Sequence, residues 1–171
     1  MGHKEEKIKY LFFENPRKQF QIREIARLTK IPKTTTERIL KTLNKKGIIK
    51  REKEHVFPSY AANEESSLYK YEKKISIFNR IFHSGLSDEL ENELMPKCIV
   101  LFGSCAKGEY TKESDIDLFV QAKGKINVEK YEKQLNHKIN LIMEEDLSKL
   151  SNELLNNIIN GIKLRGYLKI K

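Results

Sequence analysis

Residues 100–120 read VLFGSCAKGEYTKESDIDLFV, so that two apolar runs are joined through Gly-Ser and the second run carries Asp-Ile-Asp. Two carboxylates in an apolar run require an explanation, because charged side chains are seldom buried. One explanation is an edge strand that turns Asp115 and Asp117 to water while Ile116 and Leu118 face the core. The other is a ligand site, since alternate residues of a strand point to the same face.

The Gly-Ser pair favours the ligand site. Gly103 and Ser104 follow the strand-like run KCIVLF at a place where the backbone must turn and can approach a ligand closely. Asp115 and Asp117 would lie about 7 Å apart along the strand, and such a pair can hold one or two Mg²⁺ ions. The Ser104 hydroxyl and nearby backbone N–H groups can then bind an anionic ligand.

Composition limits the kind of protein that this site belongs to. The 171 residues suggest one domain or two small ones, and two cysteines, Cys98 and Cys105, are too few for a disulfide framework or a zinc site. No apolar run approaches the roughly 18 residues of a membrane span, and the first residues lack the apolar segment of a signal peptide. We therefore expect a cytoplasmic protein that does not act at a membrane.

The net charge is concentrated in the first third of the chain. Residues 1–62 contain 16 lysines and arginines against 7 acidic residues, and so carry the whole net charge of +9. Residues 63–171 contain 17 of each and are neutral. This partition is typical of a basic module attached to a neutral one, and it predicts a polyanion as partner of the first module.

The basic module shows three helical patterns followed by a hairpin. The helices are expected in KEEKIKYLFFENP, FQIREIARLTKIP and TTTERILKTLNKKG, the last with Thr34 and Glu37 spaced as a capping box and Gly47 as a C-terminal cap. Two short strands are expected around the charged tip KREKEH. This order resembles a winged helix-turn-helix domain over most of residues 5–62, so we expect such a domain in residues 1–62. A helical domain that binds a partner protein is the alternative.

The winged-helix resemblance implies that the third helix enters the major groove of double-stranded DNA and that the hairpin contacts the backbone. It implies the following DNA-binding residues: Lys33, Thr34, Thr35, Arg38, Lys41, Lys45, Lys50, Arg51 and Lys53.

Residues 63–95 are expected to form a helical connector. Leu68, Tyr71, Ile75, Phe78 and Phe82 follow a 3, 4, 3, 4 spacing, which predicts a narrow apolar stripe on one helix. Such a stripe packs on a neighbouring domain or forms the surface of a homodimer, which a two-fold DNA site requires. A second short helix, SDELENELMP, should end at Pro96.

The remaining residues, 96–171, are expected to form an α/β (α+β) module with a small mixed sheet. Strands are predicted in KCIVLF, DIDLFVQA and HKINLIM, and helices in NVEKYEKQLN and DLSKLSNELLNNIINGIKL, while GYLKIK is a last strand or a solvated end. His83 and His137 are expected to be structural or surface groups, since neither has a second ligand at metal-site spacing.

The pattern Gly-Ser, ten residues, Asp-x-Asp resembles the nucleotidyltransferase superfamily that includes DNA polymerase beta. Gly108 and Ser114 make the module similar to the minimal, antitoxin-like branch, whose partners are HEPN-type toxin proteins. The resemblance implies that Asp115, Asp117 and Ser104 are catalytic and that nucleoside triphosphate, as ATP, binds with Mg²⁺. It implies nucleotide binding by Gly103, Ser104, Lys107, Gly108 and Ser114.

One position departs from the superfamily pattern. A third carboxylate usually comes from a later strand, and in HKINLIM the matching residue is Asn140, which can offer a carbonyl oxygen to a metal but cannot act as a general base. Glu144 shares its strand parity but lies past the expected strand end, and Glu145 and Asp146 suit the start of the next helix.

Three functions are compatible with these patterns. The first is a transcriptional regulator that transfers a nucleoside monophosphate to an acceptor such as a protein hydroxyl. The second is a DNA-binding regulator whose C-terminal domain only binds nucleotide or a partner, because the change at Asn140 weakens or removes catalysis. The third is an enzyme acting on nucleic acid, for which the short C-terminal module leaves little room.

Overall fold

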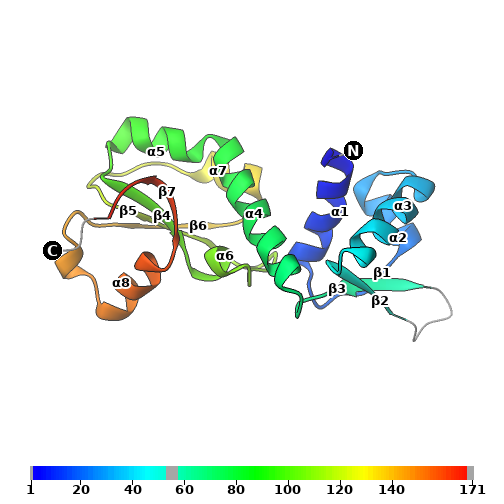
Figure 1. The fold of residues 1–171 in the computed structure, drawn as a ribbon. Coiled ribbons are helices and arrows are strands. Elements are labelled where there is room, and N and C mark those ends of the chain that lie inside the picture. The colour runs from blue at the N-terminus through cyan, green and yellow to red at the C-terminus, as the bar shows by residue number, and fades with distance from the viewer. Residues whose placement is uncertain (1, 53–57, 169–171) are drawn as a thin grey trace. The chain divides into compact units, whose positions relative to one another are not determined.

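A computed structural model describes residues 2–52 and 58–168 (Figure 1). The chain forms two compact units, Met1–Ser76 and Ile77–Lys171. Lys53, which we predicted to contact DNA, lies outside the described residues, as do residues 54 and 55 of the charged hairpin tip. Within the described ranges, no helix combines the length and apolar character needed to cross a membrane.

The first unit has the order of elements expected of a winged helix-turn-helix domain. Its three strands pair antiparallel in the order β1-β3-β2. The second predicted helix begins two residues too early, because Phe20 and Gln21 form strand β1. The elements are α1 (Gly2–Glu14), β1 (Phe20–Gln21), α2 (Ile22–Thr29), α3 (Lys33–Lys45), β2 (Ile49–Glu52) and β3 (Ser59–Ala62).

The helices of this unit enclose a core of aliphatic and aromatic side chains. Ile8 and Phe12 lie one turn apart on α1 and are fully buried, because residues four apart share a helix face. Phe12 makes an edge-to-face contact with Phe20 at a centroid distance of 5.4 Å. The predicted apolar face of α3, namely Ile39, Leu40 and Leu43, is buried.

Of the two predicted ends of α3, the C-terminal one is confirmed and the capping box at the N-terminal one is wrong. At the C-terminal end Gly47 takes φ +75°, and the amide of Ile48 donates to the Leu43 carbonyl at 3.0 Å, which confirms the predicted glycine stop. The capping box at Thr34 is wrong, because α3 begins at Lys33 and Pro32 occupies the N-cap position without a side-chain hydrogen bond. The proline ring already holds φ at −53°, so the chain enters the helix without a side-chain cap.

The connector forms α4 (Ser67–Ser84), and the boundary between the two units falls inside it. α4 buries a face that includes Tyr69, Ile77 and Ile81. The predicted apolar stripe lies on another face. Exposed members of that stripe are Leu68, Tyr71, Ile75 and Phe82.

The second unit is a mixed α/β fold, as expected. Its four-stranded sheet has the order β6-β5-β4-β7, in which β5 and β6 are parallel and the other pairs antiparallel. The elements after α4 are α5 (Leu86–Leu94), β4 (Cys98–Phe102), α6 (Gly103–Lys107), β5 (Ile116–Val120), α7 (Glu129–Leu135), β6 (Ile139–Met143), η1 (Leu147–Lys149), α8 (Asn152–Ile159) and β7 (Ile162–Gly166).

The single helix predicted over residues 146–164 is wrong. The segment is divided into η1, α8 and β7, because the Ser151 hydroxyl starts a new helix by accepting from the Leu154 amide at 3.2 Å. At Gly161 an added Cβ would lie 2.5 Å from the Leu101 carbonyl oxygen, so only glycine lets the chain turn this closely against β4. After this turn the chain pairs with β4 as β7, a strand that the helical pattern concealed.

Helices cover both faces of this sheet. Figure 1 shows α5 and α7 on one face and α8 on the other. On the α8 face, Val100, Phe102 and Phe119 form a buried cluster with Ile158 of α8. β5 therefore lies between two neighbouring strands and between two helical layers.

The burial difference between two leucines of the helix-turn-helix module predicts a difference in stability. Leu40 of α3 is fully buried, whereas Leu28 of α2 is 50% exposed. Leu40→Ala should lower the free energy of unfolding of the first unit by about 2–5 kcal/mol through lost burial and a residual cavity, and Leu28→Ala by less than about 0.5 kcal/mol. Urea unfolding followed by helical circular dichroism measures both. Equal losses would contradict the assigned core.

Candidate functional site

The Asp-Ile-Asp segment lies on a central strand. Within β5, which is flanked by β4 and β6, Asp117 is directly opposite Phe102 on one side and Asn140 on the other. It shares the α8 face of the sheet with buried Phe119, since the two residues are two positions apart. The alternative in which Asp115 and Asp117 face solvent from an edge strand is therefore wrong.

Gly103 makes room for the Asp117 side chain. It takes φ +69°, a conformation that favours glycine, at the point where β4 turns into α6. A Cβ at this position would lie 2.4 Å from Oδ2 of Asp117. Any larger residue would therefore strain the turn and displace the carboxylate.

Asn140 lies beside Asp117, as the alignment of HKINLIM predicted. Its Nδ2 donates a hydrogen bond to Oδ1 of Asp117 at 3.0 Å. The amide thus fixes the carboxylate and leaves its own carbonyl oxygen for another ligand. Glu144 cannot replace it, because its amide bonds the Val120 carbonyl at the opposite end of β5.

The strand that carries Asn140 is held at its start by a contact that the sequence patterns did not reveal. Oε1 of Glu132 in α7 accepts from the Ile139 amide at 3.0 Å, and Oε2 accepts from Lys138 at 3.1 Å. The backbone N–H of Ile139, followed by the hydrogen bond from Lys138, lowers the pKa of Glu132. A carboxylate seven residues upstream of the strand thus fixes where β6 begins.

Ser104 and Asp115 belong to the same end of the sheet as Gly103 and Asp117. Ser104 is half-buried in the first turn of α6, and Asp115 is exposed directly before β5. β4 ends and β5 and β6 begin at this edge. The structure therefore places the predicted glycine, serine, carboxylates and Asn140 at one edge of the sheet, the edge that these strand ends form.

The other predicted nucleotide-binding residues have visible structural roles or face solvent. Lys107 is exposed, and Gly108 is buried with φ +74° as the C-terminal cap of α6. The Ser114 hydroxyl accepts from the Thr111 amide at 2.9 Å and so holds the turn before Asp115. His137 is buried, with Nδ1 2.7 Å from the Ser114 carbonyl, which confirms its structural role.

The donor set of this edge is compatible with Mg²⁺. Asp115, Asp117 and Asn140 offer oxygen atoms, the ligand type that Mg²⁺ prefers, and Mg²⁺ commonly takes one or two carboxylates and completes its shell with water and phosphate. In residues 2–52 and 58–168, no group of three or more His, Cys, Asp or Glu side chains is placed to hold a metal.

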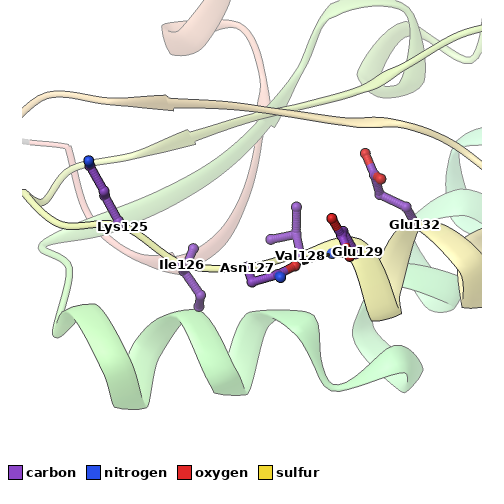
Figure 2. Close-up of a pocket in the computed structure, with 6 residues that line it drawn as sticks. All are labelled: Lys125, Ile126, Asn127, Val128, Glu129 and Glu132. Carbon is purple, nitrogen blue, oxygen red and sulfur yellow. Dashed lines mark hydrogen bonds between the residues drawn. The ribbon is translucent and has the colours of Figure 1, made fainter.

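A separate hollow lies along the segment between β5 and α7. It has a volume of about 520 Å³ and contains none of the predicted site residues (Figure 2). Its lining consists of Lys125, Ile126, Asn127, Val128, Glu129 and Glu132.

The predicted DNA-binding residues of α3 form an exposed polar face opposite its buried one. Thr35 is half-buried, and its predicted partners on the helix are exposed: Lys33, Thr34, Arg38, Lys41 and Lys45. On the wing, Lys50 and Arg51 of β2 are exposed as well.

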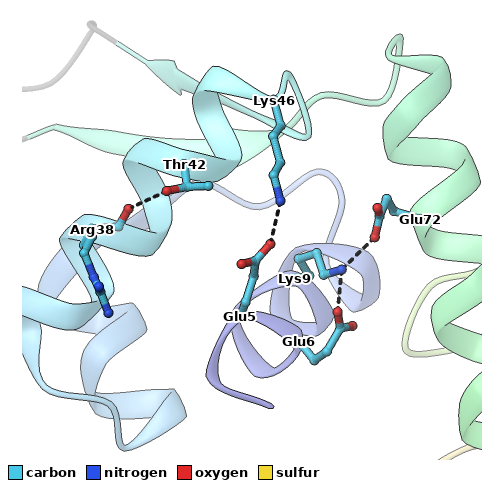
Figure 3. Close-up of polar contacts among 7 residues, drawn as sticks. All are labelled: Glu5, Glu6, Lys9, Arg38, Thr42, Lys46 and Glu72. Carbon is cyan, nitrogen blue, oxygen red and sulfur yellow. Dashed lines mark hydrogen bonds and ion pairs between the residues drawn. The ribbon is translucent and has the colours of Figure 1, made fainter. Parts of the chain in front are cut away.

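Some of these cations are engaged in ion pairs at the surface. Lys33 is 3.4 Å from Glu37, and Lys50 is 3.4 Å from Glu52. Such exposed pairs contribute little to stability and can exchange their carboxylate for a phosphate. Figure 3 shows the neighbouring pair between Lys46 and Glu5, at 3.0 Å, which ties the C-terminal end of α3 to α1.

Comparison with protein families agrees with both modules. Residues 11–53 match the family model of the IclR helix-turn-helix domain, and residues 84–166 match that of the polymerase beta nucleotidyltransferase domain. No match was found among the curated proteins or among the solved structures.

Two glycines with similar backbone conformations allow a test of the contact between Gly103 and Asp117. Gly103 has φ +69° and Gly85 has φ +82°, but a Cβ on Gly85 would meet nothing within 4 Å. Both Gly→Ala changes should cost about 1–2 kcal/mol of conformational strain. Only Gly103→Ala should also move the carboxylate and shift the NMR signals of the Asn140 side-chain amide. Unmoved signals in Gly103→Ala would contradict the described contact.

Proposed function

We propose that this protein, a fusion of a DNA-binding helix-turn-helix domain with a nucleotidyltransferase domain, is a transcriptional regulator that transfers a nucleoside monophosphate from ATP to an acceptor. The observation that supports this best is the position of Asp117 on a central strand, packed on Gly103 and bonded to Asn140. An ionisable side chain on a sheet face that also carries Phe102 and Phe119 costs stability, and this favours a chemical role for it.

Each residue of the edge has a proposed role. Asp115 and Asp117 would hold Mg²⁺, which neutralises negative charge on the triphosphate when it is bound. Ser104, half-buried at the turn after β4, would donate its hydroxyl to the phosphates. Lys107 and Gly108 follow in the same short helix and its cap, and Ser114 holds the turn that presents Asp115. We propose these as nucleotide-binding residues.

The acceptor must react without help from Asn140. A neutral amide takes up no proton from an attacking hydroxyl. The site would therefore act by positioning the nucleotide and neutralising its charge, without a general base. We propose a hydroxyl on a partner protein of the HEPN toxin type as acceptor, in line with the antitoxin-like resemblance. The hydroxyl oxygen would form a bond to the α-phosphorus of ATP, pyrophosphate would leave, and the hydroxyl proton would pass to solvent.

A second candidate function is supported by the same hydrogen bond. The Asn140 amide already satisfies Oδ1 of Asp117 at 3.0 Å. The site can therefore hold a nucleotide, but it lacks a general base for transferring it. In this case the C-terminal domain binds nucleotide or a partner, and DNA binding is the output. An enzyme acting on nucleic acid is less favoured, since residues 96–171 leave little room for the subdomains that would position a polynucleotide.

Regulation of a two-fold DNA site would require a homodimer. The exposed apolar residues of α4, which include Tyr71 and Phe82, are our candidate for its surface.

Charge removal from α3 tests the DNA-binding proposal. The triple change of Lys33, Arg38 and Lys41 to Ala should weaken duplex binding and flatten its salt dependence by up to about 0.9 in log K per log salt for each lost phosphate contact. Fluorescence anisotropy of a labelled duplex at several salt concentrations measures both quantities.

The matched control changes three exposed lysines of the second unit to Ala, namely Lys112, Lys125 and Lys133. It has the same change in net charge and should leave binding and slope unchanged. An equal loss in both triples would contradict a specific site on α3 and would favour the enzyme that acts on nucleic acid.

Exchanges between carboxylate and amide side chains test the proposed metal ligand Asp117 and the role of Asn140. Asp117→Asn should abolish Mg²⁺-dependent ATP binding in calorimetry and leave DNA binding intact, because the two units have separate cores. Asn140→Asp should raise transfer of label from α-phosphate-labelled ATP, since it adds a ligand and a possible base.

The Asn140→Asp change has a second readout that does not depend on activity. It replaces the amide donor to Asp117 with a like charge, so without Mg²⁺ the second unit should be less stable than wild type, and Mg²⁺ should restore more stability than it does in wild type. If Mg²⁺ stabilises neither protein, the proposed metal site is wrong. If Mg²⁺ binds and no transfer occurs in either protein, the binding-only function is supported.

A further inference from the structure

A hollow on the first unit lies between the start of α1 and the exposed side of α3. It has a volume of about 340 Å³ and is lined by His3, Lys4, Thr35, Arg38 and Ile39. Ile39 is buried at its floor, whereas His3, Lys4 and Arg38 are exposed around it. Two basic side chains, an imidazole and a hydroxyl thus surround one space that contains no acidic lining residue.

Within the described ranges, the basic residues around this hollow lack the acidic partners that neighbouring lysines have. Lys46 is paired with Glu5 at 3.0 Å and Lys18 with Glu24 at 2.9 Å. Among the described residues, His3, Lys4 and Arg38 have no ion pair. Figure 3 shows the Arg38 side chain directed away from the carboxylates drawn on α1. The cations Lys4 and Arg38, which have no counter-ion in the described part of the chain, repel one another and favour an external anion.

The lining groups match a phosphate group. Arg38 and Lys4 supply positive charge and N–H donors, and the Thr35 hydroxyl adds a neutral donor. Thr35 and Arg38 belong to the helix that we propose to enter the major groove, so a phosphate that reaches the hollow comes from the strand bordering that groove. A free phosphate or nucleotide offers the same chemistry, and only experiment separates the two sources.

We propose that this hollow binds a backbone phosphate of double-stranded DNA, and that His3 and Lys4 of α1 extend the DNA interface beyond α3 and the wing. This inference rests on the proposed DNA-binding function. It adds a contact from the first turn of α1, a segment outside the predicted DNA-binding residues. The contact would fix the position of α3 along the duplex without reading sequence.

The test uses the full chain with a short mixed-sequence DNA duplex and, separately, inorganic phosphate. Lys4→Gln should weaken duplex binding and make the slope of log K against log salt less steep by about 0.9. Lys70→Gln is the matched control, since Lys70 is an exposed lysine of the same unit that does not line the hollow. In parallel, the imidazole NMR signals of His3 should shift on adding duplex, and inorganic phosphate at the same concentration should leave them in place.

The outcomes separate this inference from the function on which it rests. If wild type binds duplex and Lys4→Gln behaves like Lys70→Gln, the hollow is not a phosphate site and DNA binding by α3 still stands. If inorganic phosphate shifts the His3 signals and duplex does not, the hollow is a free-anion site and the proposal is overturned. If wild type does not bind duplex, the DNA-binding function itself fails together with this inference.

Discussion

The contact between Asp117 and Gly103 is the constraint around which the second unit is organised. A carboxylate on a sheet face shared with Phe102 and Phe119 needs space and a polar partner. The missing side chain of Gly103 supplies the space, and the amide of Asn140 supplies the partner at 3.0 Å. The order of the sheet meets this need, because β5 lies between β4, which leads into Gly103, and β6, which carries Asn140.

Local patterns predicted most elements but not all pairings. Apolar spacing placed α1, α3, α5 and the strands β4, β5 and β6, because burial on one face imposes its period on the sequence. It missed β1, which has two residues, and β7, whose residues continued a helical pattern. Both strands exist because they pair with a distant partner, β3 and β4 respectively, and a pattern that is read along one segment does not contain that partner.

The same limit applies to the site. The spacing of Gly103, Asp115 and Asp117 predicted that they act together, and the resemblance to the nucleotidyltransferase superfamily matched Asn140 to its third carboxylate. The structure brings these positions to one edge. The contribution of Glu132 was not predicted, since the sequence pattern of one helix does not identify the Ile139 amide of the next strand as its partner. The hollow beside His3 and Lys4 depends likewise on how α1 packs on α3.

The place of Asn140 in the sheet has a dynamic consequence. Asp117 and Phe102 lie on strands with two neighbours each, whereas β6 is an edge strand paired only with β5. Backbone amides of an edge strand open by local fluctuations at lower free energy than those of central strands, and exchange with solvent hydrogen sooner. The residue that distinguishes this site is thus carried by its most easily opened strand, and a transient opening of β6 would release the Asn140 amide while Asp117 stays seated on Gly103.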